Sequence, residues 1–342
     1  MPRKLLKWVG GKDYLTRYLL TRVPYTKIYV EPFFGGGSLF FARRPVEIEV
    51  INDINKELTS FWRVVKDPNR FAQLLYLIEM TPYSRVEFDE FVRELKESGW
   101  RDDPEVVRAF KFFYVRRNSI SASGRTLSVS RINQSKGPGW YAIYKTAIST
   151  HKRLRNAVIE CDDFEVIFRR YDSPEATFYC DPPYPLDSIR DPDSLKSAYG
   201  HVMSVEDHKR FLDCAVKAKG AVVISTYPNP MYDEILGRAG FLAEYFDVAV
   251  SAIVQSGKRA RATEVVWRNR KAAEISSSRP LLIHIEEASH GSARVSEDRD
   301  SPVKGGSSDA DSGDIQDQEL HRESFSPEAR DDRGGDTDRR AH

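Results

Sequence analysis

The chain has 342 residues, of which 40% are hydrophobic and 30% charged, and its formal net charge is +1. This apolar content is sufficient for a folded core, and no apolar run of about 18 residues is present that could span a membrane. The N-terminus has basic residues but lacks the apolar segment of a secretion signal. The three cysteines are scattered and match no zinc-binding spacing. These features predict a cytoplasmic protein with no membrane association and no metal site.

The charge is distributed unevenly along the chain. Residues 1–270 contain 42 lysines and arginines against 34 carboxylates, whereas residues 271–342 contain 10 against 17. The stretch 106–159 contains 11 basic residues and no carboxylate at all. Solvated surfaces normally mix both signs, so this stretch predicts contact with a polyanion, with a merely basic solvated face as the alternative. The segment 272–342 is dominated by Ser, Asp, Glu, Arg and Gly, and we expect a disordered polar tail.

The N-terminal elements have glycine-rich turns. A first turn, Trp8-Val-Gly-Gly-Lys12, leads into a segment with helical apolar spacing. Lys27 to Phe41 reads as strand, glycine turn and helix start, which is the opening of a Rossmann-like βαβ unit. Its turn, Gly35 to Gly37, lets a cofactor lie against bare backbone, and its spacing does not imply a nicotinamide cofactor. A second strand ends before Asp53, where an acid can accept both hydroxyls of a ribose.

The middle of the chain predicts a nucleic-acid surface. Residues 54–105 have helical spacing, and two polar loops follow at 118–125 and 134–140. Basic and amide side chains on loops suit phosphate and base-edge contacts. The candidates for DNA contact are Arg116, Arg117, Asn118, Arg125, Arg131, Asn133 and Gln134, together with Lys258 and Arg259 in a basic loop before the final strand.

Asp181-Pro-Pro-Tyr184 follows an apolar strand, residues 177–180. The two prolines remove backbone donors and hold the chain extended at the strand's carboxyl end. The Asp181 carboxylate and the Pro182 carbonyl then become neighbouring acceptors beside the ring of Tyr184. Two acceptors and an aromatic plate suit the exocyclic amino group of a nucleobase turned out of its helix. A strand that ends in a proline turn with Asp181 as its cap is the alternative for the tetrapeptide alone.

Taken in order, these segments resemble the Dam-like D12 class of adenine-N6 DNA methyltransferases. The matching segments are Lys7 to Lys12, Glu31-Pro-Phe-Phe-Gly-Gly-Gly37, Asn52-Asp53, Asp162-Asp163-Phe164, Asp181 to Tyr184, Val223 to Tyr227 and Glu264-Val-Val-Trp267. The resemblance implies an α/β fold with a Rossmann-like sheet flanked by helices and a mainly helical inserted target-recognition domain. It implies S-adenosylmethionine as cofactor and double-stranded DNA as partner.

The resemblance also implies roles for individual residues. Cofactor contacts would come from Trp8, Lys12, Glu31, Phe33, Gly35, Gly37, Asp53, Asp163 and Asp181. Asp181, Pro182 and Tyr184 would act on the base. The implied domains are a first core part at 1–60, a target-recognition domain at 61–155 and a second core part at 156–271. The tail at 272–342 lies outside the resemblance.

The sequence leaves alternatives open. Segment 118–131 departs most from enterobacterial members of this class and is similar to phage-type relatives. N4-cytosine methylation, RNA-adenine methylation and a non-catalytic DNA-binding protein compete with the main interpretation. Neither a partner restriction endonuclease nor the oligomeric state can be read from the chain.

Overall fold

The computed structural model describes residues 4–8, 10–97, 99–128, 143–185, 202–253 and 259–277. Residues 1–283 form one compact unit by their contacts. Of the predicted tail at 272–342, residues 278–342 lie outside the described residues.

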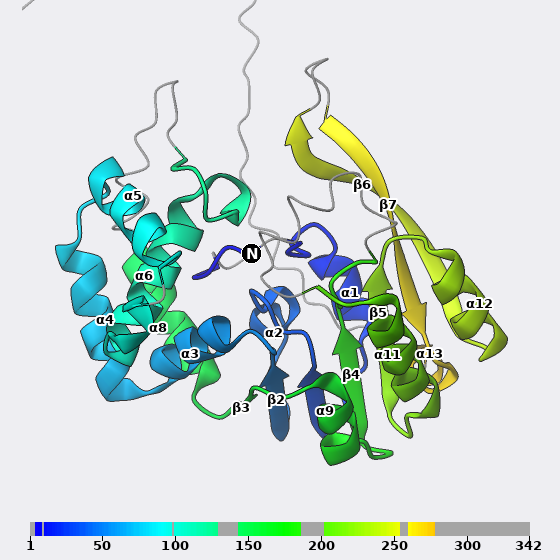
Figure 1. The fold of residues 1–342 in the computed structure, drawn as a ribbon. Helices are drawn as coiled ribbons and strands as arrows, with labels where there is room; N and C mark the ends of the chain where they lie inside the picture. The colour runs from blue at the N-terminus through cyan, green and yellow to red at the C-terminus, as the bar shows by residue number, and fades with distance from the viewer. Residues whose placement is uncertain are drawn as a thin grey trace, which may run out of the picture. The chain divides into compact units, whose positions relative to one another are not determined.

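The unit is built on a mixed seven-stranded sheet with the order β3-β2-β1-β4-β5-β7-β6 (Figure 1). Its strands are β1 (Ile28–Glu31), β2 (Ile48–Asn52), β3 (Val158–Glu160), β4 (Ala176–Cys180), β5 (Ala221–Thr226), β6 (Leu242–Ile253) and β7 (Arg259–Arg268). The first five strands are parallel, and β7 pairs antiparallel with both β5 and β6. The chain order reverses between β1 and β4, and in open α/β sheets ligands bind at such a switch point. The predicted α/β Rossmann-like class is confirmed.

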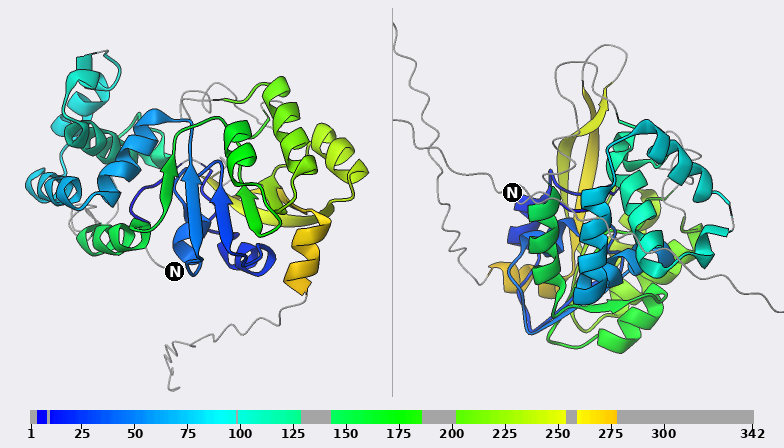
Figure 2. Two further views of the ribbon diagram at one scale, coloured as in Figure 1. Left: turned by 90° about the horizontal axis from the view of Figure 1, so that it is seen from below. Right: turned by 90° about the vertical axis from the view of Figure 1, so that its left-hand side faces the viewer.

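Helices cover both faces of the sheet (Figure 2). One layer comprises α1 (Thr16–Arg22), α2 (Ser38–Ala42) and α13 (Arg270–Ser277), and the other comprises α9 (Phe164–Tyr171), α11 (Val205–Lys217) and α12 (Pro230–Arg238). Alternate residues of a strand point to opposite faces. Tyr29 of β1 therefore joins the first apolar cluster, and Val30 joins the second.

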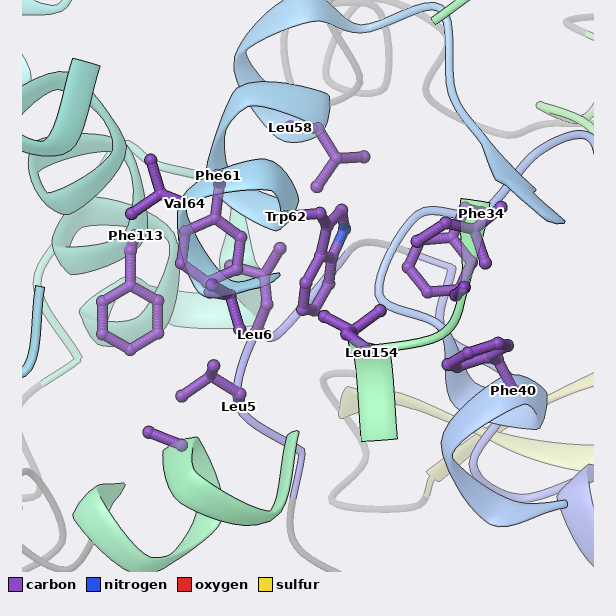
Figure 3. Packing of buried hydrophobic residues seen from close by; sticks show 14 of the residues in the cluster. Leu5, Leu6, Phe34, Phe40, Leu58, Phe61, Trp62, Val64, Phe113 and Leu154 are labelled. Carbon is purple, nitrogen blue, oxygen red and sulfur yellow. The ribbon is translucent and has the colours of Figure 1, made fainter. Parts of the chain in front are cut away.

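A group of helices lies beside the β2–β3 edge (Figure 1). It contains α3 (Lys56–Lys66), α4 (Pro68–Met80), α5 (Arg85–Glu94), α6 (Glu105–Asn118) and α8 (Ile143–Leu154), with short 3-10 turns η1 (Gly99–Asp102) and η2 (Ile120–Ala122). Phe61 stacks on Phe113 with ring centroids 5.3 Å apart, next to the buried Trp62 (Figure 3). Burying one such side chain contributes about 1.5–3 kcal/mol. These helices share an apolar cluster with one face of the sheet.

Two expectations about the C-terminal region are wrong. The ordered chain does not end at 271, because α13 continues to Ser277 with Ala272 fully buried. The segment expected as a basic loop before the last strand is itself strand from Arg259, paired with β6. Pairing with β6 makes this basic segment a strand, although its residues are not typical of strands.

Candidate active site

A cavity of about 200 Å³ lies at the carboxyl ends of the parallel strands. Each strand from β1 to β4 contributes a polar residue at or just after its end: Glu31, Asp53, Asp162 and Asp181. All eleven residues predicted for catalysis or cofactor contact line this one cavity, although the motifs are spread over 177 positions of the sequence, from Trp8 to Tyr184. The parallel sheet explains the convergence, because the carboxyl ends of parallel strands meet at one edge.

The glycine turn after β1 packs against Trp8. Gly35 has a φ of +51°, and a Cβ atom there would lie 2.7 Å from Cδ1 of Trp8. Gly37 has a φ of +65°, and a Cβ there would lie 2.5 Å from Cζ of Phe34. Glycine tolerates both the left-handed conformation and the close approach. The turn thus exposes its backbone to the cavity, and the ring of Trp8 packs against Gly35.

Asp53 ties this turn to the end of β2. Its Oδ2 accepts from the Gly35 amide at 3.0 Å, and its Oδ1 accepts from the Asn55 amide at 2.9 Å. The preceding Asn52 donates to the carbonyls of Pro32 at 2.9 Å and Asp162 at 3.0 Å. Backbone groups from three strand ends are therefore fixed by two neighbouring side chains, which stabilises the shape of the cavity.

Asp181 receives two hydrogen bonds on one oxygen. Nζ of Lys12 donates to Oδ1 at 2.6 Å, and Oγ of Ser225 donates to the same atom at 3.2 Å. The hydroxyl of Tyr179 lies 3.0 Å from Ser225 Oγ. Burial raises the pKa of Asp181, while Lys12 and Ser225 oppose that rise. The Asp181 side chain is 22% exposed, so the carboxylate remains accessible.

Tyr184 is held on three sides. Its hydroxyl donates to both carboxylate oxygens of Glu264 at 3.0 Å. Its ring lies against Tyr227 with centroids 4.2 Å apart, and Lys12 Nζ lies 4.6 Å from its centroid. Tyr14 donates a further hydrogen bond to Glu264. The ring next to Asp181 is therefore fixed by contacts from distant parts of the chain.

The cavity carries a net negative charge. Among the described residues that line it, six have a carboxyl group and one, Lys12, has an ammonium group. The carboxyl groups are those of Glu31, Asp53, Asp162, Asp163, Asp181 and Asp207. Burial raises the pKa of Glu31 to about 8, so this group adds little negative charge near neutral pH. A negative, partly buried cavity favours a cationic ligand. A sulfonium cofactor carries such a positive charge.

Two predicted cofactor residues have other partners in the structure. Glu31 is 2% exposed and accepts from the Tyr29 hydroxyl at 2.6 Å, and burial raises its pKa to about 8. Asp163 caps α9 by accepting from the Glu165 amide at 2.9 Å, and the same oxygen accepts from Arg210 at 3.1 Å. Phe33 also lines the cavity.

The predicted DNA contacts are placed differently from one another. Arg116 stacks over Trp8 at 5.1 Å from the ring centroid and donates to the Ala122 carbonyl at 3.1 Å. Arg117 donates to the Lys4 carbonyl at 2.9 Å, Asn118 is only 6% exposed, and Arg125 is exposed. Burial lowers the pKa of Arg116 to about 10. Arg131, Asn133, Gln134 and Lys258 lie outside the described residues, and Arg259 begins β7. Asn118 is therefore buried at the end of α6, whereas Arg116 is half-buried against Trp8.

Sequence reasoning assigned no role to three residues of this site. Ser225 interrupts the apolar run of β5, and Glu264 is an acid beside the apolar residues of β7. A polar residue within an otherwise buried strand was the available signal for both. No local sequence pattern marks Tyr14, because its role depends on a hydrogen bond to Glu264, which is 250 positions away.

The fold and the site define a methyltransferase-type α/β enzyme: a doubly wound sheet with a glycine turn after the first strand, an acid after the second strand and an acidic cavity at the switch point. The chain belongs to the D12 class N6 adenine-specific DNA methyltransferase family, whose model matches residues 8–233. It is therefore an adenine-specific DNA methyltransferase that uses S-adenosylmethionine.

Three relatives illustrate the match. Type II methyltransferase M1.LlaDCHI of Lactococcus lactis subsp. cremoris is 29% identical over 78% of this chain and 95% of its own length. Type II methyltransferase M.MjaIII of Methanocaldococcus jannaschii is 29% identical over 53% of this chain and 69% of its own length. The DNA N-6-adenine-methyltransferase of Escherichia phage P1 is 24% identical over 71% of this chain and 32% of its own length.

Within the described residues, no helix has the length and apolar character needed to cross a membrane. The same residues contain no group of three or more potential metal ligands.

Proposed function

We propose that the chain methylates N6 of an adenine turned out of duplex DNA, with Asp181, Pro182 and Tyr184 acting on the base. The observation that carries this proposal is that Asp181 and Tyr184 both line the acidic cavity and both contact Nζ of Lys12. The base would stack on Tyr184, a contact worth roughly 1–3 kcal/mol.

The amino group is a poor nucleophile, because its lone pair is delocalised into the purine ring. Hydrogen bonds from N6 to the Asp181 carboxylate and the Pro182 carbonyl favour tetrahedral character at nitrogen as the reaction proceeds. This stabilisation acts on charge that develops in the transition state. Transfer forms a carbon–nitrogen bond, breaks a carbon–sulfur bond and requires N6 to lose one proton. We assign this proton to the Asp181 carboxylate, which would already accept a hydrogen bond from N6.

S-adenosylmethionine supplies a methyl group activated by a sulfonium. The residues that would hold it are the backbone of Gly35 and Gly37, the carboxylate of Asp53 and the carboxyl group of Glu31. Trp8 would support the turn, and Asp163 and Phe33 would complete the lining. Lys12 would neutralise Asp181 beside this region.

We infer that residues 61–155, which include the second half of α3 and helices α4, α5, α6 and α8, form the target-recognition domain. Arg125 is exposed next to η2, and a guanidinium group there suits phosphate or guanine contacts. Arg117, Arg131, Lys258 and Arg259 are further candidates for this role.

We also infer a biological setting. Two relatives are named as type II methyltransferases, which supports pairing with a restriction endonuclease. A phage P1 protein is among the similar proteins, and we keep the phage-type character of segment 118–131 as part of this proposal. We place the activity in the cytoplasm, where DNA and free thiols such as Cys180 are found.

Nucleoside mass spectrometry tests this proposal directly. Mixed-sequence duplex DNA is incubated with the protein and S-adenosylmethionine, digested and analysed. N6-methyladenine is expected, and sequencing of modified sites then gives the recognition motif. N4-methylcytosine, or methylation of RNA alone, would refute the proposed substrate. Cofactor binding with no methylated base would refute catalysis.

A further inference from the structure

Glu264 is a buried carboxylate just behind the reaction centre. It lies on β7, is 0% exposed and is not among the described residues that line the cavity. Burial raises its pKa, and Lys12 and two tyrosine hydroxyls oppose that rise. Burying an acid is unfavourable unless hydrogen bonds and nearby charges compensate. Its partners therefore indicate what the residue does.

Both partners of Glu264 belong to the reaction centre or its support. Tyr184 donates to both carboxylate oxygens at 3.0 Å, and Tyr14 donates to Oε1. Tyr14 is two residues after Lys12, which contacts Asp181. One carboxylate on β7 thus joins the segment that carries Lys12 to the tyrosine that follows β4.

These contacts restrict the motion of the Tyr184 ring. A tyrosine ring can rotate about its side-chain torsions unless its hydroxyl is anchored or its faces are packed. Tyr227 packs against the ring with centroids 4.2 Å apart, and Glu264 anchors the hydroxyl. A stacking platform for an extruded base must be fixed before the base arrives, because ordering it during the reaction lowers the rate.

We propose that Glu264 is a positioning residue for methyl transfer, which fixes Tyr184 as the stacking platform and holds the Lys12 segment through Tyr14. This inference rests on the proposed function, in which Tyr184 stacks on the target adenine.

The same hairpin offers a matched control. Glu244 on β6 accepts hydrogen bonds from Tyr18, Arg22 and Arg268. None of these partners is among the described residues lining the cavity. Glu244→Ala therefore removes a tyrosine-binding carboxylate from the same β6–β7 pair without touching the site.

The experiment measures single-turnover methylation, cofactor affinity and base stacking. Enzyme in excess is mixed with S-adenosylmethionine and a duplex carrying the mapped target site. A second duplex has 2-aminopurine in place of the target adenine, whose fluorescence falls when it stacks on a ring. Glu264→Ala should lower the single-turnover rate by about tenfold to a hundredfold, the range expected for losing a hydrogen bond to a buried charge. Its 2-aminopurine signal should be brighter than wild type, and its cofactor affinity should stay close to wild type.

Glu264→Gln separates positioning from folding. Its amide oxygen can still accept from both hydroxyls, since Oε1 accepts from Tyr14 and Tyr184 in the structure. The rate should lie between those of wild type and Glu264→Ala. A merely structural role would lower the melting temperature and leave the rate of the folded protein unchanged.

The outcomes are distinct. A Glu264→Ala rate equal to that of Glu244→Ala would overturn the inference. If circular dichroism shows Glu264→Ala unfolded, Tyr184→Phe decides, because it removes the same hydrogen bond and leaves Tyr14 on Glu264. A slower rate with brighter 2-aminopurine then supports the inference, and an unchanged rate overturns it. Wild-type protein that forms no N6-methyladenine would refute the proposed function instead.

Discussion

Lys12 and Asp181, which are 169 positions apart, meet in a hydrogen-bonded ion pair with 2.6 Å between Nζ and Oδ1. Lys12 is only 2% exposed, and the same Nζ lies 4.6 Å from the centroid of the Tyr184 ring. The ammonium group of Lys12 therefore favours the ionised form of Asp181 and lies next to the ring of Tyr184. The pair joins the N-terminal glycine segment to the Asp-Pro-Pro-Tyr motif.

Removing the ammonium should shift the pH dependence of methylation upward. Burial raises the pKa of Asp181, and Lys12 is the largest opposing influence. In Lys12→Met the pKa of Asp181 should rise further. The carboxyl group that accepts from N6 would then stay protonated up to a higher pH. We expect the acid limb of the single-turnover rate to move to higher pH, and the rate near neutral pH to fall. The pH–rate profile measures both.

Ser225→Ala provides a graded comparison for this shift. The serine hydroxyl donates to the same Asp181 oxygen at 3.2 Å, but it carries no charge. The acid limb should move in the same direction by a smaller amount. An acid limb that stays in place in Lys12→Met would show that Asp181 does not need to be ionised.

The motifs allowed much of the site to be predicted from the sequence. Gly35, Asp53 and Asp181 follow apolar strands, and parallel strands bring their carboxyl ends together. A local pattern was therefore enough to identify residues that meet in space. The resemblance of the ordered motifs to one family supplied the reaction.

The remainder of the site depends on packing that a sequence does not display. Glu264 reaches Tyr184 through the antiparallel pairing of β7 with β5, and no local pattern encodes that pairing. Arg116 is a basic residue in a basic stretch, which predicts a DNA contact, yet its position on α6 places it over the ring of Trp8. Charge can be counted along a chain, whereas the side of a helix that becomes buried is decided by its neighbours.

Asp181 and Asp53 should separate catalysis from cofactor binding. Asp181→Ala should abolish methyl transfer, because N6 loses its carboxylate acceptor. Asp53→Ala should weaken cofactor binding more, because it also releases the Gly35 amide from a 3.0 Å hydrogen bond. Isothermal titration with S-adenosylmethionine and a methylation assay measure the two effects. Folded Asp181→Ala protein that retains turnover would exclude the assigned role, and circular dichroism checks the fold.

Gly35→Ala should disturb the cofactor turn. The φ of +51° is unfavourable for alanine, and the new Cβ would lie 2.7 Å from Cδ1 of Trp8. We expect cofactor affinity to fall by about tenfold or more, since strained backbone of this kind costs about 1–3 kcal/mol. Gly237→Ala is the matched control, because a Cβ there meets nothing within 4 Å. That helical substitution should be neutral or stabilising by up to about 1 kcal/mol. Equal affinities for both variants would contradict the close packing of Trp8 on the turn.

Glu31→Gln should change how stability depends on pH. Burial raises the pKa of Glu31 from 4.5 to about 8. Between those values the folded chain keeps a proton that the unfolded chain has lost, so the stability due to Glu31 falls as pH rises through this window. Glutamine cannot ionise. The melting temperature of Glu31→Gln minus that of wild type should therefore increase as the pH rises from 4.5 to about 8, and then stay constant. Thermal melts without cofactor measure this difference, and a difference independent of pH would contradict the raised pKa.

Arg125 and Arg116 should differ in how they affect DNA binding. Arg125 is exposed beside η2, so Arg125→Ala should reduce the slope of log Kd against log salt by about 1, as expected for one lost phosphate contact. Arg116 instead lies 5.1 Å from the centroid of Trp8 and bonds the Ala122 carbonyl. Arg116→Ala should leave the slope unchanged and weaken cofactor binding, because Trp8 loses packing behind the glycine turn. Fluorescence anisotropy of a labelled duplex at several salt concentrations measures the slope.

The control is Arg238→Ala, which removes an exposed arginine paired with Glu234 on α12 and should change neither the salt slope nor the cofactor affinity. Equal losses of slope in Arg116→Ala and Arg125→Ala would show that Arg116 leaves Trp8 to contact phosphate when DNA binds.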